Sequence, residues 1–136
     1  MPDVVDLLLA QHERVREQFI HLLAATGQQK VELFAGLVEM LHRHEATEQQ
    51  IVHPLLGGID DILSEERAAD TAIAELIALG VDHPAFDGKL ADLHAAVLAH
   101  AAHEEEQEFP ALRETIPAAQ LVALASQVRA NQTEVG

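Results

Sequence analysis

Apolar residues recur every three or four positions along four long stretches of the chain, and short stretches rich in glycine, proline and aspartate separate them. This spacing is the period of a helix that buries one face. Caps and helix breakers set the expected bounds. We expect helices from a cap at Asp3 to about Ala25, from about Gln29 to Val52 with Gly57-Gly58 in the following turn, from a cap at Ser64 to Gly80, and from about Asp87 to Glu108, before Pro110.

Four long helices joined by short connections predict an all-α fold, an up-down-up-down four-helix bundle. A short amphipathic C-terminal helix is expected after Pro117. The chain shows no low-complexity linker, so we expect a single domain over residues 1–136, with residues 114–136 as a C-terminal helical tail.

Polar residues interrupt the buried rows at matching places. His12 stands in the first row, between Leu8 and Val15, and His44 with Glu48 replaces two successive apolar residues of the second row. The fourth row contains the same pair as His100 and Glu104. Burying an unpaired carboxylate or imidazole costs several kcal/mol, about 3 to 5. These five residues therefore need partners, which are either one another or a bound cation.

The two His-Glu pairs belong to an internal repeat. Both follow the pattern H-x3-E-x5-P, ending at Pro54 and at Pro110, with His100 placed 56 residues after His44. The repeat predicts a counterpart of His12 near residue 68, where the chain has no histidine. Asp70, and Glu66 one turn earlier, lie on the buried row of the third helix and are the candidates for this wall of the site.

The residue types restrict the chemistry of the site. There is no cysteine, so thiolate ligands, disulfides and cysteine nucleophiles are excluded. Imidazole together with carboxylate suits iron or manganese, and zinc is a less favoured occupant. A helical spacing of i and i+4 places both members of each pair on one face, where they reach metal ions between helices.

The helical angle of about 100° per residue separates most of the remaining histidines from the predicted site. Relative to the nearest candidate ligand, four of them point well away from the predicted site and are expected to be solvated or boundary residues: His21, His42, His53 and His94. His103 lies about 60° from His100 and is a candidate outer partner or alternative ligand. The acidic run after Glu104, which includes Glu108, is expected to form a solvated face.

Charge and the lack of other motifs exclude several functions. With 8 Lys and Arg against 23 Asp and Glu, the net charge is −15, which disfavours nucleic acid and anionic membranes as partners. No apolar run reaches the length of a membrane span and the first residues lack a basic segment, so we expect a cytoplasmic protein. No phosphate-binding loop is present, because no lysine follows Gly57-Gly58 and no strand is expected before it.

The motif set resembles the hemerythrin-like proteins, also called the HHE cation-binding domain family. Its pattern is one His on the first helix, H-x3-E on the second, one His on the third and H-x3-E on the fourth, around a non-haem di-iron centre. Five of these six positions match over about residues 3–113, and the departure is Asp70 where the family has its third-helix histidine. The implied metal ligands are His12, His44, Glu48, Asp70, His100 and Glu104.

The resemblance implies that this chain binds iron and a small ligand such as dioxygen, peroxide or nitric oxide. We expect a monomer or weak homodimer. Three functions follow as alternatives. The protein binds, senses or stores its ligand or iron; or it is an enzyme that decomposes peroxide or oxidises Fe(II); or it is a metal-free structural bundle. A carboxylate-rich site is, by analogy, closer to those that oxidise or store iron.

Overall fold

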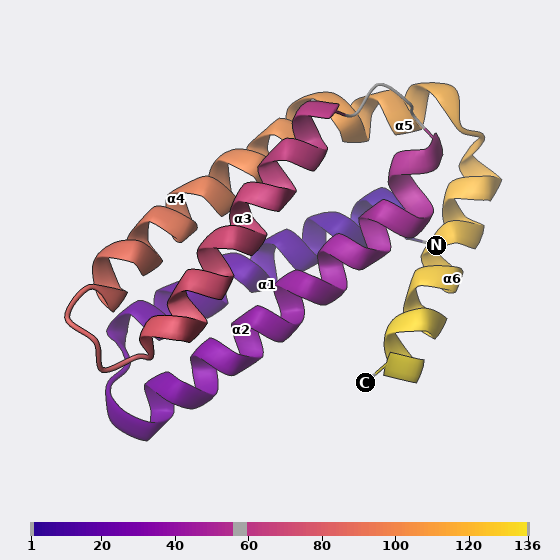
Figure 1. The fold of residues 1–136 in the computed structure, drawn as a ribbon. Helices are drawn as coiled ribbons and strands as arrows, with labels where there is room; N and C mark the ends of the chain where they lie inside the picture. The colour runs from indigo at the N-terminus through magenta and orange to yellow at the C-terminus, as the bar shows by residue number, and fades with distance from the viewer. Residues whose placement is uncertain (1, 56–59, 136) are drawn as a thin grey trace.

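The computed structural model describes residues 2–55 and 60–135, without the side chains of residues 51, 60–63 and 131–135. The described chain consists of helices joined by short connections and has no strand (Figure 1). Its elements are α1 (Val4–Ala24), α2 (Gly27–Thr47), the π-helical η1 (Glu48–Val52), the 3₁₀ turn η2 (His53–Leu55), α3 (Asp60–Leu79), α4 (Phe86–His103), the π-helical η3 (Glu104–Glu108), α5 (Phe109–Thr115) and α6 (Ala118–Val135).

The predicted bundle is confirmed. α1 to α4 run along one another in alternating directions as an up-down-up-down bundle (Figure 1). No helix in the described ranges is long and apolar enough to cross a membrane. The expected turn at Gly57-Gly58 lies outside the described residues.

Capping residues and glycines predicted some of the helix ends correctly and others incorrectly. Asp3 caps α1 through a capping box with Asp6, as predicted. Gly80 follows α3 with φ of 81°, a conformation that glycine adopts at little cost. The predicted start at Ser64 is wrong, because α3 begins at Asp60 and Ser64 lies inside it.

Proline did not end the second and fourth helices in the expected way. The last α-helical residues are Thr47 and His103, and a π-helical turn follows each of them. The chain is still helical at Pro110, which lies in the first turn of α5. A π turn is wider than an α turn, which relieves the clash between a proline ring and the preceding carbonyl groups.

The two π turns begin at the same place in the repeat. η1 starts at Glu48 and η3 at Glu104, and each is closed by a bond from the fifth residue on, His53 N–H to Glu48 and Phe109 N–H to Glu104. A π turn contains one extra residue, so the side chains after it are rotated by about 100° from their α-helical positions. The turns therefore decide which residues after each His-Glu pair face the interior.

Two apolar clusters fill the bundle, one toward each end. The first contains Phe19, Leu37, Ile73, Phe86 and Leu93, among others. The second contains Leu8, Val52, Phe109, Leu112 and Leu121, among others. On α1, Gln11 and His12 lie between residues of the two clusters and are also buried. A polar layer therefore separates the two apolar clusters.

α6 is longer than predicted. It has 18 residues rather than forming a short tail, and it lies across one end of the bundle (Figure 1). Leu121, Ala125 and Val128 are buried in the second apolar cluster together with Val4 and Val5 of α1. This packing covers the end of the bundle next to the polar layer.

Candidate metal centre

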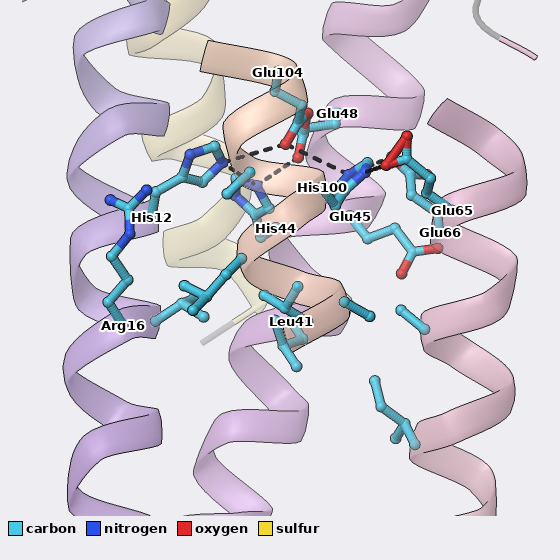
Figure 2. A pocket seen from close by; sticks show the side chains of 17 residues that line it. His12, Arg16, Leu41, His44, Glu45, Glu48, Glu65, Glu66, His100 and Glu104 are labelled. Carbon is cyan, nitrogen blue, oxygen red and sulfur yellow. Dashed lines mark hydrogen bonds and ion pairs between the residues drawn. The ribbon is translucent and has the colours of Figure 1, made fainter. Parts of the chain in front are cut away.

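The polar layer brings together the five residues that match the sequence pattern. His12 comes from α1, His44 from α2, His100 from α4, and Glu48 and Glu104 are the first residues of the two π turns. Figure 2 shows His12 and His44 pointing at the two carboxylates, with His100 approaching from the other side. Glu48 and Glu104 have no exposed surface.

The Nε2 atoms of the histidines face the centre of this cluster. His12 Nε2 lies 3.2 Å from His44 Nε2 and 3.3 Å from a carboxylate oxygen of Glu104. His44 Nε2 lies 2.5 Å from Glu48 Oε1, and His100 Nε2 lies 3.5 Å from Glu104 Oε1. Two imidazole nitrogens and two carboxylates thus converge on one point, within 4.8 Å of one another.

The Nδ1 atoms of the same histidines face outward and meet oxygen acceptors. His12 Nδ1 lies 2.7 Å from Glu105, which Arg16 also contacts at 2.9 Å. His44 Nδ1 lies 2.6 Å from the Gln11 side-chain oxygen. His100 Nδ1 lies 3.2 Å from Glu65. An Nδ1–H bonded to an oxygen holds the proton there and leaves Nε2 free as a ligand, which is the usual arrangement around metal-binding histidines.

The surroundings of the two central carboxylates, Glu48 and Glu104, suit a bound cation. No oxygen of Glu48 or Glu104 has a hydrogen-bond partner of good geometry among the described residues, although both side chains are fully buried. Donor atoms held by one metal at about 2.1 Å lie about 3.0 to 3.4 Å apart, close to most of the separations observed here. The layer therefore has the donor types, the spacing and the unsatisfied charge that a metal ion requires.

Without a cation the charges of the layer act against one another. Burial alone would raise the pKa of Glu48, yet the neighbouring His44 lowers it well below the ordinary value. Burial disfavours the charged form of His44, but Glu48 raises its pKa. Burial and the charge of His44 lower the pKa of His12. The positive charge is therefore favoured on the His44 imidazole and disfavoured on the His12 imidazole.

α3 contributes Glu66 to the layer rather than Asp70. Glu66 is 3% exposed and one of its oxygens lies 3.7 Å from His100 Nε2. It forms a possible metal-binding group with Glu48 and His100. Asp70 lies one turn further along α3, is 45% exposed, and faces His42 at 4.0 Å. Burial and the neighbouring Asp70 raise the pKa of Glu45 to about 8, which places Asp70 beside Glu45.

Two residues that the sequence analysis left outside the site are buried in it. His53 is 1% exposed, and its Nε2 lies 3.3 Å from Glu108, 3.5 Å from Glu66 and 3.6 Å from Glu48. The expectation that His53 and Glu108 are solvated is wrong. For His53 that expectation rests on an unbroken α-helix, and the π turn after Glu48 rotates its side chain inward. Glu108 is four residues after Glu104 and lies on the same helical face, although the acidic run around it indicates a solvated surface. Pro54 and Pro110 were the available signal for these turns.

Burial affects both of these residues strongly. Burial, together with the charges of Glu48 and Glu66, raises the pKa of Glu108 to about 7, although His53 opposes the shift. Burial disfavours the charged form of His53, but the surrounding carboxylates raise its pKa.

The other histidines lie where the helical angles predicted. His21 and His42 are exposed. His94 stacks on Phe19 with ring centroids 4.6 Å apart. His103 contacts Glu65 at 2.6 Å, and Glu65 also contacts His100, so His103 is an outer partner of the layer.

A pocket reaches the layer from one side of the bundle. Its walls are largely apolar and include Val15, Leu41, Ile73 and Val97. Its inner end is formed by His12, His44, Glu48, Glu66, His100 and Glu104, as Figure 2 shows in part. Small neutral molecules are suited to such a passage, because they lose little hydration on entering it.

A helical bundle with a buried layer of histidines and carboxylates belongs to the class of cation-binding bundle proteins. Comparisons with known proteins define the family. Residues 3–112 match the model of the hemerythrin HHE cation-binding domain. The chain therefore belongs to the hemerythrin HHE cation-binding domain family, as the sequence motifs indicated.

Two known proteins show the extent of this similarity. A crystal structure of a hemerythrin HHE cation-binding domain-containing protein from Mycobacterium kansasii superposes with a TM-score of 0.88, at 20% identity, over 98% of this chain and 87% of that one. This likeness shows the fold. A protein from Nostoc sp. named DNA nickase is 21% identical over 140 residues, which cover 98% of this chain and 40% of the relative's length.

Proposed function

We propose that this protein binds two iron ions in the polar layer and uses them to handle dioxygen, peroxide, nitric oxide or iron itself. The first position is formed by His12, His44, Glu48 and Glu104, and the second includes Glu48, Glu66 and His100. Glu48 belongs to both groups and is the bridging carboxylate. The observation that supports this most strongly is the orientation of the three histidines, with Nδ1 bonded outward and Nε2 directed inward.

Bound iron with an open coordination position supplies binding and redox chemistry toward small oxygen- and nitrogen-containing molecules. The residues of the chain determine which molecules arrive and how the site is held. The apolar pocket favours small neutral ligands, while Glu105 and Gln11 fix the rings of His12 and His44. Manganese or zinc could use the same donors and are the alternative metals.

The abundance of carboxylates favours turnover or storage over reversible oxygen carriage. Glu48, Glu66, Glu104 and Glu108 are all buried in the layer. Nearby negative charge stabilises Fe(III) relative to Fe(II). An enzyme that decomposes peroxide or oxidises Fe(II) is therefore the second candidate function, while a metal-free structural bundle is the third.

We propose no nucleic-acid partner, although the relative from Nostoc is named a DNA nickase. The net charge of −15 repels a phosphate backbone. This chain also spans only 40% of that relative. We likewise propose a cytoplasmic protein without membrane contact that is a monomer or a weak homodimer.

The test of the proposal compares two histidines two residues apart on α2. We expect iron-loaded wild type to show a near-ultraviolet and visible absorption that disappears on anaerobic reduction and returns with dioxygen or peroxide. His44→Ala should lose most of this absorption and most of its iron, because it removes a ligand of the first position. His42→Ala, whose side chain is exposed, should retain both. Equal iron in both variants would contradict the ligand assignment.

A second prediction decides which residue of α3 is a metal ligand. Glu66→Gln should lower the iron content by about one ion per chain, since Glu66 faces His100 in the buried layer. Asp70→Asn should leave iron content unchanged, because Asp70 faces His42. Metal analysis of both variants decides between them. Loss of iron in Asp70→Asn with normal iron in Glu66→Gln would restore Asp70 as the ligand.

A further inference from the structure

The second metal position has few protein ligands if it holds only Glu48, Glu66 and His100. The missing third-helix histidine leaves it without a second imidazole. His53 and Glu108 lie beside it and have no place in the family's motif pattern. Both are buried, and their position against the carboxylates requires an explanation.

The contacts of His53 are unlike those of an ordinary buried histidine. Its Nε2 lies 3.3 to 3.6 Å from oxygens of Glu48, Glu66 and Glu108, which come from η1, α3 and η3. Neither ring nitrogen has a hydrogen-bond partner of good geometry within the described part of the chain. Both oxygens of Glu108 also lack one. A hydrogen bond has a typical N···O distance of about 2.9 Å and is directed at one acceptor, whereas ligands of one metal surround it at these larger separations.

Shared neighbours connect His53 with the second position. Glu66 Oε1 lies 3.5 Å from His53 Nε2 and 3.7 Å from His100 Nε2. Glu48 presents Oε1 to His44 and Oε2 to His53, so its two oxygens face opposite sides. His53, Glu108, Glu48 and Glu104 also form a group whose donor atoms all lie within 4.8 Å of one another.

We propose that His53 and Glu108 are ligands of the second metal ion and replace the third-helix histidine of the family pattern. The inference rests on the proposed metal-binding function. The π turn after Glu48 rotates His53 into the layer, and Glu108 lies on the same helical face as Glu104, within contact of His53. Neither His53 nor Glu108 lines the apolar pocket, so as ligands they would not take up the space that a small molecule enters.

The internal repeat supplies the substitutions for the test. The residue 56 positions after His53 is Phe109, and the residue 56 positions before Glu108 is Val52. Both counterparts are buried next to the layer without donor atoms. His53→Phe and Glu108→Val therefore introduce side chains that the fold already accepts at the equivalent places. Their matched controls are His42→Phe and Glu106→Val, at exposed positions of the same helical stretches.

The experiment measures metal per chain after loading with Fe(II) under anaerobic conditions, and the thermal midpoint of each metal-free variant. We expect about two iron ions in the wild type and in both controls, and a loss of at least one in His53→Phe and in Glu108→Val. The metal-free midpoints of these two variants should equal or exceed that of the wild type, since each substitution removes an unsatisfied buried polar group. Two irons retained in both variants would overturn the inference, whereas a wild type without iron would instead overturn the proposed function.

Discussion

Glu48→Gln is expected to abolish binding of both metal ions while leaving the helical fold intact. Glu48 belongs to every group of residues in the described chain that could hold a metal. Glutamine has nearly the same shape but is neutral and cannot bridge two cations. Because altering an outer partner of a ligand already costs about 10- to 100-fold in affinity, loss of a shared ligand should cost more than about 100-fold.

The measurement is a titration of anaerobic protein with Fe(II), followed by metal analysis after gel filtration. The matched control is Glu39→Gln on α2, where the carboxylate is 67% exposed and forms an ion pair with the nearby Arg43. Circular dichroism at 222 nm should be the same for wild type and both variants. If Glu48→Gln still retained two metal ions, the layer would not be the binding site.

Metal removal is expected to lower the thermal midpoint of the wild type by about 9 °C. The physical reason is the set of four buried glutamates, which repel one another without a cation: Glu48, Glu66, Glu104 and Glu108. A ligand present at about 100 times its dissociation constant stabilises the folded state by about 2.7 kcal/mol. With an unfolding entropy of about 2.1 cal/mol/K per residue, this corresponds to about 9 °C for a chain of this length.

Melting curves with a chelator and with added Fe(II), recorded anaerobically, give this difference directly. Glu48→Gln is the control, because its midpoint should not respond to metal. Identical wild-type midpoints in the two conditions would support the metal-free structural bundle.

The sequence predicted the parts of the layer that depend on regular α-helix. His12, His44 and His100 replace apolar residues at helical spacing, and the structure brings them together with Glu48 and Glu104. The same reasoning could not separate Glu66 from Asp70. They lie on one face of α3 but one turn apart, about 6 Å along the axis, and only Glu66 is level with His100.

His53 enters the layer through a change of helical period, which a fixed angle per residue does not include. A regular α-helix places His53 about 180° from His44. The π turn after Glu48 contains one extra residue, so the chain after it is rotated by about 100° and His53 contacts that carboxylate. Two prolines at equal distances after the two glutamates mark the turns and are the signal to use in similar sequences.

The central claim is that this layer is a two-metal site, and metal analysis of wild-type protein purified from iron-supplemented cells tests it most directly. The account predicts about two irons per chain, with a visible absorption that changes as the reduced sample meets oxygen. Less than half a metal ion per chain, together with a thermal midpoint that does not respond to Fe(II), would contradict it and identify the protein as a structural bundle.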